Sequence, residues 1–135
     1  MDSLKDTLRP HQLRAYDKMT TEKSGQIIIP TGGGKTFIMI ADCHRLVTTT
    51  PRNPQTIVIV APRILLANQL SNEFEPNFIH AKIAHVHSGE THHFSTTKSN
   101  ELTHWSCTNP QYDKLIFTTY HSLNRVLDSM VNINR

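Results

Sequence analysis

The sequence predicts an α/β fold in which a parallel sheet is flanked by helices. Runs such as residues 26–30 and 56–61 lack polar alternation, which is typical of strands covered on both faces. Segments with helical spacing separate these runs, and that order favours parallel pairing. The third observation is a glycine-rich loop between the apolar run at residues 26–30 and the helix expected at residues 37–47. With 135 residues, 37% of them hydrophobic and 19% charged, we expect a single domain, residues 1–135.

The first part of the chain is expected to form a helix, a strand and a second helix. Residues 8–23 predict a short helix, because Pro10 suits a first helical turn. Residues 26–30, Gln-Ile-Ile-Ile-Pro, are an apolar run and predict a strand buried on both faces. Residues 37–47 are apolar almost all round and predict a helix.

The remaining chain continues the alternation with one interruption. Residues 88–113 hold many polar residues without a clear period, so we expect a loop or an insertion there. Further strands are expected at residues 56–61, 82–86 and 114–119, and further helices from residue 63 to Pro76 and from residue 121 onward.

The loop at residues 31–36, Thr-Gly-Gly-Gly-Lys-Thr, carries the clearest chemical signal. Three glycines let the backbone wrap around a phosphate, and the helix that follows adds its N-terminal partial charge. Lys35 can reach the β- and γ-phosphates, and the Thr36 hydroxyl can hold Mg²⁺. The pattern G-x-x-x-x-G-K-[ST] is not fully met, since Ile29 takes its first position. A glycine-rich turn that merely contains a lysine is the alternative.

Four segments in the same order resemble superfamily 2 helicases and translocases. Residues 29–36 resemble the P-loop of that superfamily, in which the first glycine is not required. Residues 8–12, Leu-Arg-Pro-His-Gln, resemble its adenine-recognising segment. Residues 60–69 and 117–123 resemble its two motifs that touch a nucleic-acid backbone. The likeness is closest to restriction-enzyme motor subunits and DEAD/DEAH-type proteins. It covers nearly the whole chain except residues 77–113. It implies the fold of a P-loop NTPase, in which a RecA-like parallel sheet lies between two layers of helices.

The resemblance implies ATP and Mg²⁺ as cofactors and nucleic acid as a partner, with DNA favoured over RNA. It also implies a second RecA-like lobe as a partner. Lys35 and Thr36 would make the catalytic contacts, with Thr36 reaching Mg²⁺ through the nucleotide. The implied nucleotide-binding residues are Arg9, Gln12, Thr31, Gly32, Gly33, Gly34, Lys35 and Thr36, and the implied nucleic-acid-binding residues are Arg63, Thr118, Thr119 and His121. Ordinary exposed polar residues at helix starts remain the alternative for Arg9, Gln12 and Arg63.

ATP hydrolysis in this superfamily needs an acidic motif that the sequence lacks. The chain contains no Asp-Glu dipeptide, and Asp113 and Asp128 do not end apolar strands. We therefore expect the front part of a longer motor, inactive alone, with an incomplete sheet and a tendency to self-associate. A non-catalytic module that binds nucleotide or nucleic acid is the alternative, and a small-molecule P-loop kinase is disfavoured.

Composition adds weaker constraints. A net charge of +3 permits a polyanionic partner. No apolar run reaches the ~20 residues of a membrane span, and two isolated cysteines indicate an intracellular, reducing setting. Cys43 is expected to be inert core and Trp105 a packing anchor. A zinc set of His85, His87, His92, His93, His104 and Cys107 is disfavoured for lack of a C-x₂-C pattern, and the five histidines are expected at the surface or in loops.

Overall fold

A computed structural model describes residues 7–22, 24–28, 34–49 and 54–129 of the chain. The chain divides into two compact units, residues 1–49 and residues 50–135, which we describe separately. Among the helices of the described ranges, none combines the length and the apolar character needed to cross a bilayer.

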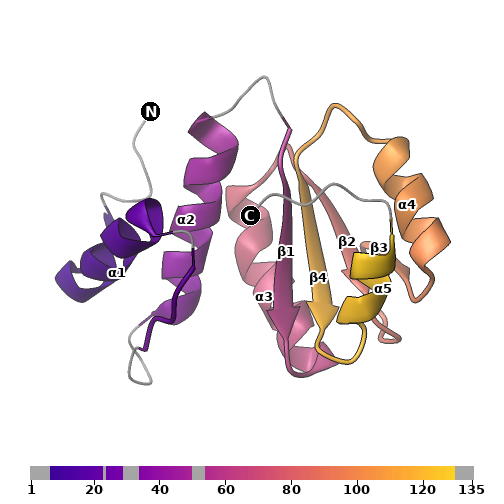
Figure 1. Cartoon of the computed structure of the whole chain (residues 1–135), viewed down its shortest axis with the longest axis horizontal. Coiled ribbons are helices and arrows are strands. Elements are labelled where there is room, and N and C mark those ends of the chain that lie inside the picture. The colour runs from indigo at the N-terminus through magenta and orange to yellow at the C-terminus, as the bar shows by residue number, and fades with distance from the viewer. Residues whose placement is uncertain (1–6, 23, 29–33, 50–53, 130–135) are drawn as a thin grey trace. The chain divides into compact units, whose positions relative to one another are not determined.

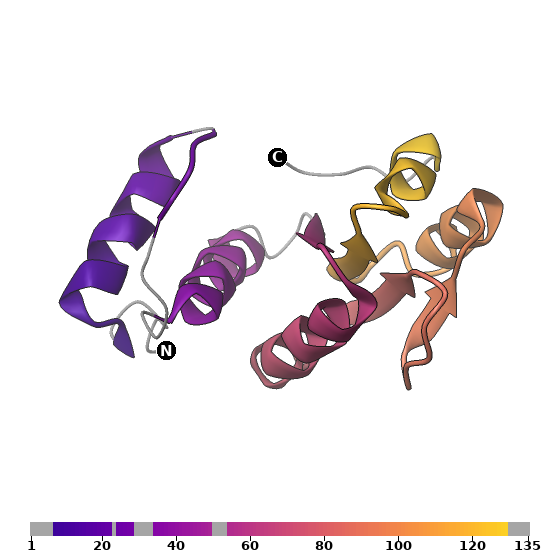
Figure 2. The same ribbon diagram turned by 90° about the horizontal axis from the view of Figure 1, so that it is seen from below.

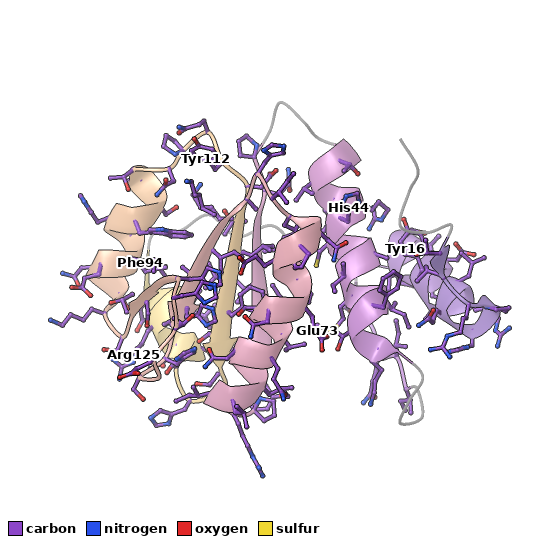
Figure 3. The ribbon with its side chains drawn as sticks, turned by 180° about the vertical axis from the view of Figure 1, so that it is seen from behind. Tyr16, His44, Glu73, Phe94, Tyr112 and Arg125 are labelled. Carbon is purple, nitrogen blue, oxygen red and sulfur yellow. The ribbon has the colours of Figure 1, made fainter. Side chains whose placement is uncertain are left out.

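The first unit contains two helices that pack against each other, α1 (Pro10–Thr21) and α2 (Lys35–Thr49). Pro10 occupies the first turn of α1, as the sequence predicts, and Tyr16 of the same helix is buried (Figure 3). Cys43 is buried in α2, and burial raises the pKa of its thiol to about 12. The thiol therefore stays protonated, and the prediction of an inert core cysteine is confirmed.

The strand expected at residues 26–30 is wrong for the part that the structure describes. Residues 24–28 have no regular secondary structure, and the side chains of Ile27 and Ile28 are 40% and 84% exposed. Residues 29 and 30 lie outside the described ranges. An apolar run becomes a strand only beside a hydrogen-bonded neighbour, and the first unit provides none for residues 24–28.

The second unit is built on a four-stranded parallel sheet with the order β1-β4-β2-β3 (Figure 1). All six residues of β4 are buried, and its centre is the apolar run Leu115, Ile116 and Phe117. The parallel sheet expected from the sequence is confirmed. Its strands are β1 (Thr56–Ala61), β2 (Lys82–Val86), β3 (Phe94–Thr96) and β4 (Lys114–Thr119).

Helices cover both faces of this sheet, which gives three layers (Figure 2). Helix α3 (Ile64–Phe74) packs on one face, where the rings of Phe74 and Phe117 meet edge to face, 5.5 Å apart. Helices α4 (Ser99–Cys107) and α5 (Leu123–Asp128) cover the other face. The core on that side consists of Ala84, Val86, Leu102, Trp105, Ile116 and Val126.

The segment expected to be a loop or an insertion is instead structured. Within residues 88–113 the chain forms β3 and α4, and Phe94 of β3 stacks on Trp105 of α4 with ring centroids 5.6 Å apart (Figure 3). The prediction that Trp105 is a packing anchor is confirmed. β3 and α4 could not be predicted from the sequence, because β3 has three residues and α4 has nine, and segments this short show no clear apolar period.

Strands β2 and β3 are parallel neighbours joined only by residues 87–93. Parallel neighbours usually need a dozen or more connecting residues, because the chain must return to the starting edge of the sheet. Here Ala84 pairs with Phe94 and Val86 with Thr96, so residues 87–93 must run back along β2. We call residues 87–93 the return loop.

Two histidines expected at the surface, His85 and His87, are almost completely buried. The Gly89 N–H donates to His87 Nδ1 (3.0 Å), so His87 carries its proton on Nε2. That N–H lies 2.9 Å from His85 Nδ1, which leaves the proton of His85 on Nε2. Nε2 of His85 is buried and has no hydrogen-bond partner among the described residues. Both rings are therefore held in the neutral form.

These buried histidines predict a loss of stability in acid. Burial lowers the pKa of His85 to about 3, helped by the charges of His87, His93 and His92, and burial also lowers the pKa of His87. The unfolded chain takes up these protons near pH 6.5, so the free energy of unfolding should fall as the pH drops from about 6.5 towards 3. Each neutral histidine contributes a limiting slope of about 1.4 kcal/mol per pH unit.

Urea titrations at several pH values, with a metal chelator present, measure this slope. His85→Gln and, independently, His87→Gln should flatten it. His104→Gln is the matched control, because His104 lies exposed on α4. Equal slopes in all variants would show that the acid sensitivity comes from other groups.

Candidate nucleotide-binding site

The described part of the glycine loop lies at the start of α2. Of the predicted phosphate-binding residues, Gly34, Lys35 and Thr36 are described, whereas residues 31–33 lie outside the described ranges. Lys35 is the first residue of α2 and is exposed, and Thr36 is half-buried. The first N–H groups of a helix lack acceptors within the helix and carry a partial positive charge, so this end of α2 suits an anion.

Gln12 connects this loop to the start of α1. Its side-chain Oε1 accepts a hydrogen bond from the Arg9 backbone N–H (2.8 Å), and its Nε2 donates to the Gly34 carbonyl (3.3 Å). The Gln12 side chain is only 4% exposed. Two segments that the sequence separates by more than twenty residues are thus held together by one buried carboxamide.

Gly34 is required by this arrangement. Its φ of +75° lies in the left-handed region, which residues with a Cβ atom rarely adopt. A Cβ atom at this position would also lie 2.1 Å from Gln12 Nε2 and 3.2 Å from Arg9 Nη2. The close approach of both side chains to the backbone therefore depends on glycine.

A cavity of about 780 Å³ lies beside Lys35 within the first unit. Residues of α1, of the segment 24–27 and of α2 line it, including the cations Arg14 and Lys18 and the apolar side chains of Ile27 and Ile38. Its volume is within the usual range for small-molecule sites. The cavity, the exposed Lys35 and the start of α2 are therefore adjacent features of one unit.

The predicted nucleic-acid-binding residues lie in the second unit, where β1 and β4 end. These parallel neighbours finish at the same edge of the sheet, and the Tyr120 N–H donates to the Ala61 carbonyl there (3.1 Å). Arg63 is exposed just before α3, and His121 is exposed just after β4. The structure therefore brings the two segments to one edge, the place where open α/β sheets bind ligands.

The two threonines of this set are not on the surface. Thr118 is fully buried, and its hydroxyl donates to the Val86 carbonyl (2.9 Å). Thr119 is 5% exposed, and its hydroxyl accepts a hydrogen bond from the Ser122 N–H (3.3 Å). Thr118 thus holds β4 to β2, and we leave it out of the proposed nucleic-acid contacts.

The carboxylate nearest to β4 in sequence has a structural position. Asp113 directly precedes β4, at the opposite edge of the sheet from Arg63, and its Oδ1 accepts a hydrogen bond from the Gln55 backbone N–H (2.7 Å). No carboxylate follows β1 or β4 in the loops that contain Arg63 and His121. Asp113 therefore fixes the start of β1.

The six residues weighed as a zinc set do not form one group. His104 and Cys107 lie exposed on α4, and His85 is paired with His87. The remaining pair, His92 and His93, instead meets Glu75, a residue that no sequence pattern connects with them. Glu75 lies 17 residues before His92 and at the end of another helix, so no local spacing could have revealed the contact.

Comparison with known proteins gives a family and a fold. The sequence profile of the family described as "Type III restriction enzyme, res subunit" matches residues 5–133. No curated protein matches the sequence. A nuclease-deletion mutant of the Type ISP restriction-modification enzyme LlaGI, solved in complex with a DNA substrate mimic, superposes with a TM-score of 0.73. The match covers 90% of this chain and 13% of that one at 20% identity, so it demonstrates a shared fold.

Substitution of Gly34 tests the junction at the start of α2. Gly34→Ala should destabilise the first unit by about 1–2 kcal/mol from the left-handed backbone alone, with a further cost from the displaced Gln12 carboxamide. Hydrogen exchange should show lower protection of α1 and α2. Gly25→Ala is the matched control, because a Cβ atom there meets nothing within 4 Å. Equal hydrogen-exchange protection of α1 and α2 in the two variants would show that the Gln12–Gly34 contact does not stabilise the first unit.

Proposed function

This chain belongs to the family of type III restriction enzyme res subunits, and we propose that it is the ATP-binding module of a helicase-type motor acting on nucleic acid. The family and the three-layer α/β fold confirm the predicted superfamily 2, RecA-like lobe. The family profile matches 5–133, which includes both the glycine loop and the edge that carries Arg63 and His121.

The hydrogen bond between Gln12 and Gly34 carries the proposal of ATP binding. In the superfamily that the chain resembles, residues equivalent to Arg9 and Gln12 contact adenine, and the glycine loop binds the phosphates. One buried side chain links these two segments here, so a ligand spanning them would meet prearranged groups. In the proposal, Arg9 and Gln12 contact the base, residues 31–34 wrap the phosphates, and Lys35 neutralises the β- and γ-phosphates.

Thr36 is the proposed contact to Mg²⁺, through its hydroxyl at the first turn of α2. Mg²⁺ bound with the nucleotide supplies charge neutralisation of the phosphate oxygens. Hydrolysis additionally needs a carboxylate and a group that positions water, and no Asp-Glu dipeptide occurs in these 135 residues. We therefore propose binding of ATP without turnover by this chain alone, which is also what a non-catalytic binding module would show.

The edge formed by the ends of β1 and β4 is the proposed contact with nucleic acid. Arg63 and His121 are exposed there, and Thr119 is the last residue of β4, paired with Ala61 at the end of β1. A guanidinium and helix N–H groups bind phosphate oxygens, so this edge would contact the backbone of nucleic acid rather than its bases. The restriction-modification enzyme with the similar fold was solved in complex with a DNA substrate mimic, which supports DNA as the partner to test first.

Calorimetric titration with ATP and Mg²⁺ tests the nucleotide site. Lys35→Ala should weaken ATP binding roughly tenfold to a hundredfold, because a charge-assisted hydrogen bond is worth about 1.5–3 kcal/mol. Lys98→Ala removes the same charge from the exposed position before α4 and is the control. Equal affinities for wild type and Lys35→Ala would exclude a phosphate-binding role for the glycine loop.

Binding of fluorescent oligonucleotides at several salt concentrations tests the proposed edge. Arg63→Ala should weaken binding to a similar extent for all sequences and lower the slope of log affinity against log salt by about 1, since one phosphate contact is lost. Lys98→Ala should leave both quantities unchanged. A sequence-dependent loss, or no loss, would contradict a backbone contact at Arg63.

A further inference from the structure

Three potential metal ligands from distant parts of the chain meet at one point of the second unit. Glu75 Oε2 lies 2.7 Å from His93 Nε2 and 3.3 Å from His92 Nε2. One ligand atom from each residue lies within 4.8 Å of the other two. Glu75 opens the short 3₁₀ helix η2 (Glu75–Asn77) after α3, whereas both histidines come from the return loop.

The topology of the sheet explains why these residues meet. The return loop runs back along β2, on the face covered by α3, because His93 stacks on His85 of β2 with ring centroids 5.4 Å apart. Helix α3 runs opposite to the strands, so its last turn and η2 lie near the starting edge of β2. The loop therefore delivers His92 and His93 to Glu75 just before β3 begins.

The two separations that involve Glu75 are close to those around a small tetrahedral ion. With metal–ligand bonds of about 2.0–2.1 Å, neighbouring donors of a tetrahedral Zn²⁺ site lie about 3.3 Å apart. Glu75 and His92 already have this separation, and Glu75 and His93 would need to part by roughly half an ångström. Two imidazoles with one carboxylate form a donor set found in zinc sites that keep an open position.

We propose that Glu75, His92 and His93 bind a divalent transition metal ion, with Zn²⁺ as the ion that the three donors suit best. The donor set lacks the additional oxygens that Mg²⁺ and Ca²⁺ require. Neither the proposed nucleotide site nor the proposed nucleic-acid contacts include any of these residues. The metal site is therefore independent of the proposed function.

The surroundings of His93 favour ligation through Nε2. Its other ring nitrogen, Nδ1, lies 3.4 Å from the Thr91 hydroxyl, a contact of the kind that commonly orients a metal-bound histidine. The ring is also held against buried His85, and the His93 side chain is only 12% exposed.

A fourth coordination position would open towards a cavity of about 800 Å³ lined by all three residues. Lys82 is the cation in this lining, and its ammonium lies 4.6 Å from the centroid of the Tyr112 ring. Phe78, Phe94 and Trp105 supply apolar walls. The ion would bind water or a small anionic ligand there, and it would also tie the return loop to the end of α3.

Titration of the chelator-stripped full chain with Zn²⁺, in competition with a chromophoric chelator, tests the proposal. One equivalent should bind and raise the thermal midpoint of unfolding. Glu75→Gln, His92→Gln and His93→Gln should each weaken Zn²⁺ binding more than tenfold, and Thr91→Val should weaken it to a smaller extent. His104→Gln and Cys107→Ser should bind like wild type, because both residues lie on α4.

The variants also separate the possible outcomes. His92 is 65% exposed, so its substitution cannot disturb the core and gives a valid result even if another variant fails to fold. Absence of Zn²⁺ binding by the wild-type chain would overturn the proposal. Loss of binding in both histidine variants but not in Glu75→Gln would reduce the site to an exposed histidine pair and would overturn the three-ligand assignment.

Discussion

The second unit depends on β4, which joins β1 to the rest of the sheet and has a hydrogen-bonded neighbour on each side. β4 pairs with β1 along all six residues and with β2 along five, and its two faces contact different helical layers. Phe117 contacts Phe74 of α3 on one face of the sheet, whereas Ile116 belongs to the core that α4 and α5 cover on the other face. The centre of this buried strand is apolar, and the polar side chains of Lys114 and Thr118 at its two ends donate hydrogen bonds to backbone carbonyls.

The same requirement explains which strands the sequence revealed. Residues 56–61 are a long apolar run and residues 114–119 contain the shorter run Leu-Ile-Phe; both have neighbouring strands, and both are strands. Residues 26–28 have the same composition but no strand beside them, and they are irregular and exposed. β3 is the opposite case, because three residues with a polar centre form a strand through pairing with β2. The local composition of a segment thus indicates whether its side chains would be buried. Whether the segment becomes a strand depends on neighbouring strands that can hydrogen-bond to it.

The candidate sites follow a similar division. The glycine loop was predictable because phosphate binding depends on a few consecutive residues, and the structure joins its last glycine to Gln12. The Glu75 cluster was not predictable, because it arises from the return loop and the end of α3, which have no common sequence pattern. Thr118 shows the converse error: its position at a strand end suggested a ligand contact, but its hydroxyl is used inside the sheet.

The strand order also has a consequence for the way the chain folds during synthesis. β1 and β2 are both made before β4, yet neither has the other as a neighbour, because β4 lies between them. Gln55, just before β1, meets Asp113 only 58 residues later. Until residues 114–119 have emerged from the ribosome, β1 therefore lacks its partner strand and β2 has only β3 beside it in the described sheet. In this interval exposed strand edges favour aggregation and contact with chaperones.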